Sequence, residues 1–110
     1  MSNIDLALYA KRLKIPNFRG VYMIDSLPSK PLFRERIIIN LDSSENEGTH
    51  WVAVKKDGDI AFYFDSFGNL KPPKEIEHYL AGVQIMYNTR RFQSFSSVIC
   101  GHWCLQFLSQ

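Results

Sequence analysis

Cysteine is scarce in this chain. Among 110 residues only Cys100 and Cys104 occur, and they stand four positions apart. If both lie on one helix, as the pattern discussed below predicts, the geometry of a native disulfide is hard to reach. The sequence therefore argues against a disulfide framework, and two reduced thiols are typical of a reducing compartment.

Long apolar runs and a strong net charge are also missing. No stretch approaches the roughly 18 apolar residues of a membrane-spanning helix, and the N-terminus lacks the apolar region of a signal peptide. Lys and Arg number 13 against 11 Asp and Glu, a net charge of +2. That charge is too small to indicate nucleic-acid binding by itself. We expect an intracellular protein that does not contact a membrane.

The chain does have the composition of a folded protein. Hydrophobic residues make up 45% of the sequence and aromatic residues 14%, which is typical of a globular domain. A length of 110 residues suits one small core. We therefore expect a single domain over residues 1–110.

The order of the expected elements predicts an α+β fold. Helical periodicity and capping residues predict three helices, at residues 4–13, at 74–81 and from about 98 towards the end. Runs rich in β-branched and aromatic residues predict four strands, at 36–41, 50–55, 60–66 and 83–87. Residues 17–31 mix proline and glycine with apolar side chains and are expected to form an ordered, packed loop. Together these elements predict a mostly antiparallel sheet with helices packed on it.

A hairpin between two of the strands predicts a specific contact. Asp57-Gly58 separates the two strand-like runs, and such a pair is the strongest short-range hairpin signal. If the turn is centred on this pair, His50 lies directly opposite Asp65. Side chains that face each other across two strands have Cβ atoms roughly 4.5–5.5 Å apart, so the imidazole and the carboxylate could form a hydrogen bond.

Two interpretations of this pair remain open. A carboxylate that holds one ring nitrogen of His50 protonated leaves the other nitrogen as a base, and it stabilises the imidazolium that forms. Asp65 and His50 could equally be an ordinary polar pair on an exposed face. Trp51 and Phe64 are expected to face each other on the opposite, core-forming side of the hairpin.

The last predicted helix carries both thiols. Cys100 lies near its start, where free N–H groups and the helix dipole favour thiolate over thiol. Gly101 allows another backbone to approach the sulfur closely. Cys104, one turn further on among apolar residues, is expected to be a small buried hydrophobe. Gln93, upstream of Cys100, is a side-chain amide that could help to bind an oxyanion.

Other roles for these residues fit the pattern less well. His102 stands two residues from Cys100, so helical geometry turns it away from the thiol. A zinc site from Cys100, Cys104, His102 and His50 lacks a second Cys-x-x-Cys or a distant His pair. We therefore expect no metal and no cofactor, and we interpret His78 as a surface residue of a helix.

Taken together, these residues resemble a known family. The resemblance rests on the order and spacing of His50-Trp51, Asp65-Ser66-Phe67-Gly68, Gln93 and Cys100-Gly101. The pattern is similar to that of the adenovirus endopeptidase (adenain) and its relatives in Maverick/Polinton elements and related double-stranded DNA viruses. More distantly, it resembles the Ulp/SENP proteases, which act on ubiquitin-like proteins.

The resemblance implies a papain-like α+β fold with the cysteine on a central helix, and it implies roles for four residues. It assigns Cys100 as the nucleophile, His50 as the general base, Asp65 as the acidic third member and Gln93 as the oxyanion-hole residue. Six residues separate Gln93 from Cys100, which fits adenain, whereas the Ulp type is usually shorter there. Asp in the third position is typical of the Ulp type, and adenain has Glu.

The resemblance also implies partners and a location. The leading expectation is an endopeptidase that cuts structural precursors of a virus or mobile element at Gly-containing sites, in the host nucleus or cytoplasm and in the virion. DNA or an activating peptide is implied by the family alone. No cysteine lies between His50 and Cys100, so a disulfide-linked activator is not expected.

Two alternatives stay open beside that expectation. One is a deconjugating protease for a ubiquitin-like protein. The other is an inactive relative that acts as a binding module, because only ten residues follow Cys100 whereas adenain continues with further helices. On either interpretation the C-terminal part of the family fold is expected to be absent from these residues.

Overall fold

The computed structural model describes residues 3–41, 50–66, 68, 71–88 and 100–109. Within them, one sheet has the strands β1 (Phe18–Met23), β2 (Arg34–Asn40), β3 (Trp51–Asp57), β4 (Ile60–Phe64) and β5 (Gln84–Tyr87). The helices are α1 (Asn3–Arg12), α2 (Lys74–Tyr79) and α3 (Cys100–Leu108). None of these helices has the length and apolarity of a membrane span.

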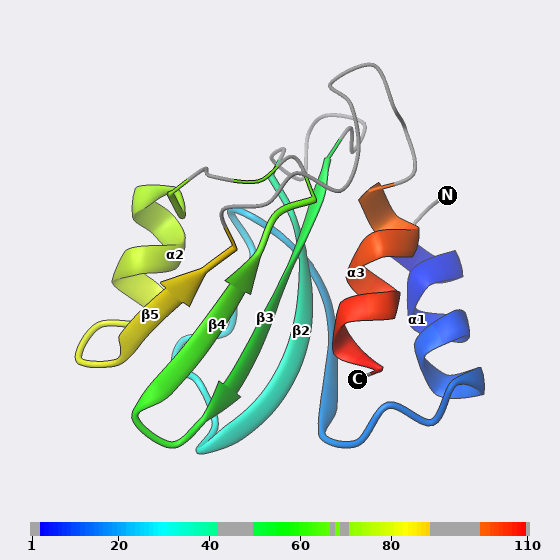
Figure 1. Cartoon of the computed structure of the whole chain (residues 1–110), viewed down its shortest axis with the longest axis horizontal. Coiled ribbons are helices and arrows are strands. Elements are labelled where there is room, and N and C mark those ends of the chain that lie inside the picture. Colours follow the sequence, from blue (N-terminus) through cyan, green and yellow to red (C-terminus); the bar gives the residue numbers. More distant parts are fainter. Residues whose placement is uncertain (1–2, 42–49, 67, 69–70, 89–99, 110) are drawn as a thin grey trace.

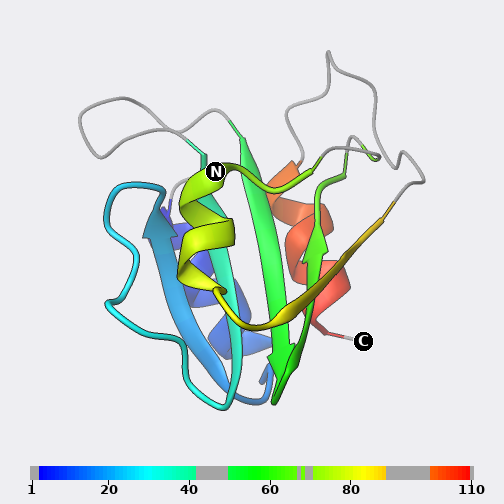
Figure 2. The same cartoon turned by 90° about the vertical axis from the view of Figure 1, so that its left-hand side faces the viewer.

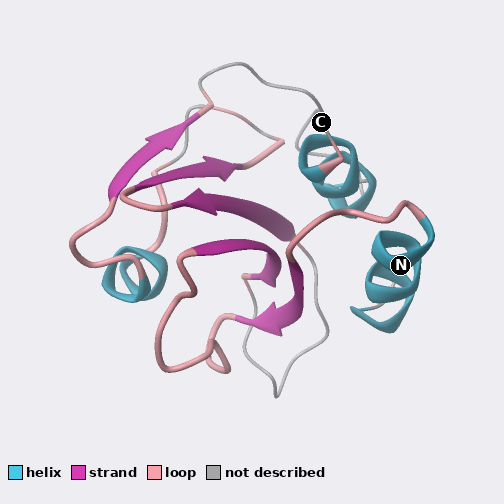
Figure 3. Ribbon diagram, turned by 90° about the horizontal axis from the view of Figure 1, so that it is seen from below, coloured by secondary structure: helices cyan, strands magenta, loops and turns pink. Residues whose placement is uncertain are grey.

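The helices cover both faces of the sheet. Helices α1 and α3 lie on one face, and α2 lies on the other (Figures 1 and 3). Figure 2 looks onto the face that carries α2, with β5 along one side of the sheet. Each face of the sheet is therefore covered by helix, which explains why the strands are so apolar.

The predicted α+β class is confirmed, and the sheet is mixed. The strands follow one another in sequence order, and β2, β3 and β4 are antiparallel neighbours, as predicted. The two outer pairings, β1 with β2 and β4 with β5, are parallel. A parallel pairing needs a long crossover connection rather than a tight turn. For β4 and β5 that connection includes α2.

Strand β1 was not predicted. Residues 17–31 were expected to form a loop, yet Phe18–Met23 pairs in parallel with β2. Gly20, whose φ is +153°, follows a register irregularity just after Phe18. All six residues of β1 are only partly buried. A half-buried strand with a glycine and a distant partner gives a weak local signal, so the proline- and glycine-rich composition misled the prediction.

The core has two layers, one on each face of the sheet. Between the sheet and helices α1 and α3 lie Leu6, Ile38, Phe64 and Leu105. Between the sheet and α2 lie Ile37, Ile39, Tyr63 and Ile76. The hairpin was expected to have one core face, on the side opposite His50 and Asp65. The second face is buried as well, because α2 packs on it, so the interpretation of the pair as a polar pair on an exposed face is wrong.

Candidate active site

The β3–β4 hairpin has a different register from the predicted one. Asp57 pairs with Ile60, and Ala53, not Trp51, faces Phe64. The turn is therefore Gly58-Asp59, where Gly58 has the positive φ of 65° that a tight hairpin turn requires. Each residue of β3 therefore faces a residue of β4 that lies two positions beyond its predicted partner. Side chains alternate between faces with a period of two, so this displacement leaves each side chain on its predicted face.

The predicted contact between His50 and Asp65 is present despite this displacement. His50 Nε2 lies 2.8 Å from Asp65 Oδ1. Diagonal neighbours on two strands remain within reach of longer side chains, which explains how the contact survives. An ionised carboxylate only accepts hydrogen bonds, so Nε2–H donates. Nδ1 is then the ring nitrogen that can exchange a proton with another group.

The pair is well shielded from water. The His50 side chain is 15% exposed and that of Asp65 is 3% exposed. The backbone N–H of Leu41 donates to the carbonyl of His50 at 2.9 Å, which extends the β2–β3 ladder as far as the histidine. A carboxylate with so little water around it interacts with the imidazole more strongly than an exposed one would.

Sequence reasoning missed a residue that contacts the backbone of Asp65. Asn88 directly follows β5. Its Oδ1 accepts from Asp65 N–H at 2.9 Å, and its Nδ2 donates to the Asp65 carbonyl at 2.7 Å. The same carbonyl accepts from Gly68 N–H at 2.9 Å. The main chain of Asp65 is thus fixed by hydrogen bonds from two directions.

The pKa of Tyr63 shows how strongly the surroundings of this pair disfavour a negative charge. Burial raises the pKa of the Tyr63 phenol well above its ordinary value, and the charge of the Asp65 carboxylate adds to that effect. The phenol therefore stays neutral at any physiological pH. This part of the sheet is dry enough that a further negative charge is strongly disfavoured.

The described part of the helix that carries the thiols begins at Cys100. Cys100 is the first residue of α3, and α3 packs on β3. The start of α3, the start of β3 and the end of β4 lie at the same end of the sheet (Figure 1). The elements that carry Cys100, His50 and Asp65 therefore meet at one edge of the molecule.

Several predictions on this segment lie outside the described residues. They are the position of Gln93, the start of the helix near residue 98 and the side chain of Cys100. The described part of α3 agrees with its predicted pattern. Cys104 is a free thiol, completely buried in the core, and His102 is exposed. His78 is exposed on α2, as predicted.

The described residues offer no metal centre. Among them, no three His, Cys, Asp or Glu side chains are grouped so that they could hold a metal ion. The zinc alternative involves the side chain of Cys100, which lies outside the described part, so it stays untested. Which residues would complete the oxyanion hole also stays a prediction.

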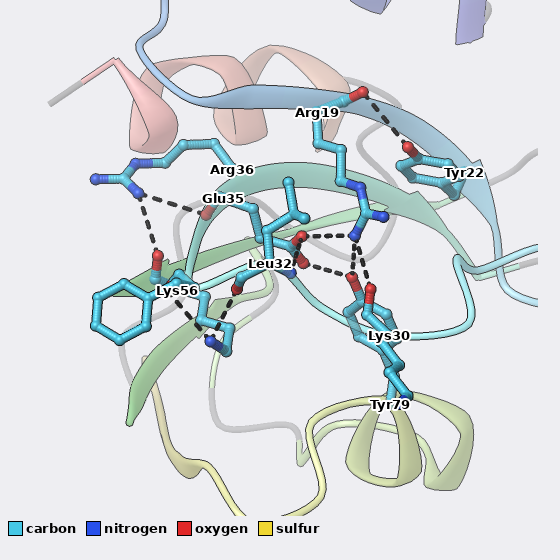
Figure 4. Close-up of polar contacts among 9 residues, drawn as sticks. Arg19, Tyr22, Lys30, Leu32, Glu35, Arg36, Lys56 and Tyr79 are labelled. Carbon is cyan, nitrogen blue, oxygen red and sulfur yellow. Dashed lines mark hydrogen bonds and ion pairs between the residues drawn. The ribbon is translucent and has the colours of Figure 1, made fainter. Parts of the chain in front are cut away.

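A second buried carboxylate lies in a separate polar cluster (Figure 4). Glu35 Oε1 is 2.8 Å from Arg19 Nη1 and accepts from Leu32 N–H at 3.0 Å, and Oε2 accepts from the Tyr79 hydroxyl. Arg19 also donates to the Lys30 carbonyl at 2.9 Å. This cluster joins β1, β2 and α2, and we interpret it as structural.

The arrangement of sheet and helices matches a fold class of known structure, that of cysteine proteases. One similar structure is the SUMO protease Ulp1 with its catalytic cysteine oxidised to a sulfinic acid; the TM-score is 0.63 at 13% identity, covering 99% of this chain and 64% of that one. Another is the ASFV pS273R protease, with a TM-score of 0.56 at 20% identity, covering 97% of this chain and 54% of that one.

These similarities establish the fold and no more. The chain spans 64% and 54% of the two protease structures that it matches. No family model matches the sequence, and no curated protein matches it.

Proposed function

We propose that this chain is a cysteine protease with Cys100 as nucleophile, His50 as general base and Asp65 as the group that orients the histidine. The observation that carries the proposal is the 2.8 Å contact between His50 Nε2 and Asp65 Oδ1. It lies at the end of the sheet where α3 begins with Cys100. Similarity to two proteases supports the same chemistry.

The proposed reaction is acyl transfer at a peptide bond. The Cys100 thiol gives its proton to His50 Nδ1, and the imidazolium is stabilised by the Asp65 carboxylate. The thiolate sulfur attacks the scissile carbonyl carbon. The imidazolium then protonates the amine nitrogen as the C–N bond breaks. A water molecule, deprotonated by Nδ1, hydrolyses the thioester and restores the thiol.

Two further groups support this reaction. The start of α3 provides the partial positive charge of a helix N-terminus, which favours the thiolate of Cys100. The Gln93 amide, together with the backbone N–H of the cysteine, would bind the oxyanion of the tetrahedral intermediate. The role of Gln93 follows from the spacing that resembles adenain. No metal or cofactor takes part in these steps.

For the substrate we propose a structural precursor protein of a virus or mobile element, cut at a Gly-containing site. The order of the four residues and the Gln93–Cys100 spacing support it. The second candidate is deconjugation of a ubiquitin-like protein, which the similarity to a SUMO protease and the Asp65-Ser66 step favour. An electrophilic probe made from SUMO or ubiquitin would separate them, because only a deconjugating enzyme would be captured.

The first test is the pH dependence of iodoacetamide alkylation, followed for each thiol by mass spectrometry. We expect Cys100 to react rapidly near pH 6 in the wild type. An ordinary thiol is only about 0.3% thiolate at that pH. Allowing for the lower nucleophilicity of low-pKa thiolates, His50→Ala should slow the reaction by roughly 10- to 100-fold.

Cys104 is the internal control in this test, since it is completely buried and should react slowly in both proteins. Reaction of Cys100 only above about pH 8, with no effect of His50→Ala, would overturn the proposal. The remaining alternative would then be a binding module with the fold of a protease.

A further inference from the structure

The side chain of Asn88 continues the sheet beyond its last backbone pair. Strands β4 and β5 end their parallel pairing at Tyr63 and Tyr87. Asn88, the residue after β5, bonds Asp65 with its side-chain amide. The carbonyl oxygen of that amide accepts from Asp65 N–H at 2.9 Å, and its NH₂ group donates to the Asp65 carbonyl at 2.7 Å. One amide thus engages both backbone groups of a single residue.

Asp65 stands where the position of its backbone matters. It lies just beyond the end of β4, and the described pairing of β3 with β4 ends at Ala53 and Phe64. At this point the Asn88 amide bonds both the N–H and the carbonyl of Asp65. The Asp65 carboxylate must reach the imidazole of His50, which it does at 2.8 Å.

The direction of the Asp65 side chain depends on these backbone bonds. A rotation of the Asp65 backbone would turn its Cα–Cβ bond and move the carboxylate away from Nε2. Functional side chains must hold their geometry to within roughly 0.5 Å and 10–20°. The Gly68 N–H, which bonds the same carbonyl at 2.9 Å, fixes only one of the two backbone groups. Asn88 fixes both.

We propose that Asn88 is a positioning residue for the Asp65–His50 pair. It acts through the backbone of Asp65 and does not touch the substrate. This inference rests on the proposed function, because Asn88 is assigned to hold Asp65, which in turn orients the base His50. The alternative is that Asn88 only stabilises the end of the sheet.

The test compares Asn88→Ala with two reference variants in the full 110-residue chain. Asp65→Asn removes the charge that receives the imidazole N–H. Tyr79→Phe is the matched control, because it removes a buried hydrogen bond from the Glu35 cluster and leaves Asp65 intact. Thermal unfolding of each variant gives its loss of stability. Two further measurements report the pair itself.

The first of these is proton NMR of the hydrogen-bonded His50 Nε2–H. We expect a low-field, slowly exchanging resonance in the wild type and in Tyr79→Phe. It should be lost in Asp65→Asn and lost or rapidly exchanging in Asn88→Ala. His78 and His102 are exposed, so their ring N–H protons exchange rapidly with water in every variant. A slowly exchanging imidazole N–H signal is therefore assigned to His50.

The second is the rate of Cys100 alkylation near pH 6. Asn88→Ala should slow it by roughly 10-fold, the lower end of the range for removal of a residue that orients a functional group. Tyr79→Phe should leave it within about twofold of the wild type once both are folded. Asn88→Ser, a neutral variant whose hydroxyl can bond only one of the two backbone groups, should be intermediate. It also keeps the test valid if the alanine variant fails to fold.

The outcomes separate the two proposals. If the wild type lacks the resonance, or Cys100 is not reactive near pH 6, the proposed function is wrong. If the wild type has both properties and Asp65→Asn loses them, but both Asn88 variants behave like Tyr79→Phe, the proposed function stands and the positioning role of Asn88 is overturned.

Discussion

Two buried carboxylates in this protein have similar surroundings and different partners. Glu35 and Asp65 are 0% and 2% exposed, and each lies 2.8 Å from a nitrogen of a basic side chain. The partner of Glu35 is Arg19, which keeps its proton at every accessible pH. The partner of Asp65 is His50, the side chain whose ordinary pKa lies nearest to neutrality.

The comparison shows how one electrostatic arrangement serves two purposes. Glu35 meets a permanent cation, the Tyr79 hydroxyl and the Leu32 N–H, so its oxygens are occupied by groups that do not change charge near neutral pH. Asp65 uses one oxygen on a ring that can gain and lose a proton. Under the proposed function the first cluster stabilises the fold and the second performs chemistry. Each prediction below tests that division.

The largest expected effect is on turnover in Asp65→Asn. In a protease triad, replacing the acidic member by its amide lowers kcat by about 10⁴-fold, equivalent to about 5 kcal/mol of transition-state free energy. We expect a loss of that order here, with little change in stability, because the amide nearly matches the carboxylate in size. The measurement is kcat on a peptide that the wild type cleaves, beside a urea unfolding curve. Full activity in the variant would place Asp65 outside the catalytic group.

The opposite behaviour is expected of Glu35→Ala. Removing the carboxylate leaves Arg19 and the Tyr79 hydroxyl without their buried acceptor, so the free energy of unfolding should fall by about 3–5 kcal/mol. Urea unfolding measures the fall, and Cys100 alkylation of the folded fraction should be unchanged. Glu77→Ala on the exposed side of α2 is the control, with an effect within about 0.5 kcal/mol. A loss as small as that of the control would show that Glu35 does not stabilise the fold.

A smaller loss is expected in Tyr79→Phe. This variant keeps the ring packed against the second core layer. It removes the hydroxyl, which donates a hydrogen bond to the charged Glu35 and accepts one from Arg19 Nη1 at 3.1 Å. Such bonds contribute about 1.5–3 kcal/mol. The shift in the urea midpoint, at constant m-value, gives the difference. A variant as stable as the wild type would mean that Arg19 and the Leu32 N–H satisfy the carboxylate without the hydroxyl.

The smallest effect is a change in alkaline pH dependence. Burial, and then the hydrogen bond to Glu35, raise the pKa of Tyr79 above its ordinary value of about 10. Tyr79 therefore keeps its proton in the folded state above pH 10, while in the unfolded chain it ionises. Its contribution to the free energy of unfolding is complete below about pH 10. That contribution declines as the pH rises further, by at most about 1.4 kcal/mol per pH unit.

Between pH 9 and 11.5, the free energy of unfolding should therefore fall less steeply with rising pH in Tyr79→Phe than in the wild type. The pKa of Tyr63 is raised too and is common to both proteins, so the difference between the two slopes isolates Tyr79. Equal slopes would contradict the assignment.

The sequence predicted the parts of this comparison that depend on local pattern. The hairpin, its faces and the His50–Asp65 contact all follow from a period of two and a glycine turn. The register was wrong by two residues, because Gly58 takes the first position of the turn rather than the second. Only an even displacement could have left the contact in place.

The parts that depend on distant segments were not predicted. Asn88 lies 23 positions from Asp65, and Tyr79 lies 44 positions from Glu35. These partners meet only because α2 crosses one face of the sheet and β5 pairs in parallel with β4. Parallel neighbours have no turn signal between them. For the same reason the sequence predicts a loop where β1 forms.

The short distance along the chain between His50 and Asp65 has a consequence for folding. The two residues are 15 positions apart on one hairpin, and local structures of this kind form early and at a small entropic cost. Cys100 joins them from 35 positions beyond Asp65, after β5 and α3 have been placed. If Cys100 is the nucleophile, a nascent or partly folded chain holds base and acid but no assembled thiol. Such a chain would become able to cleave a peptide bond only when the last helix packs on the sheet.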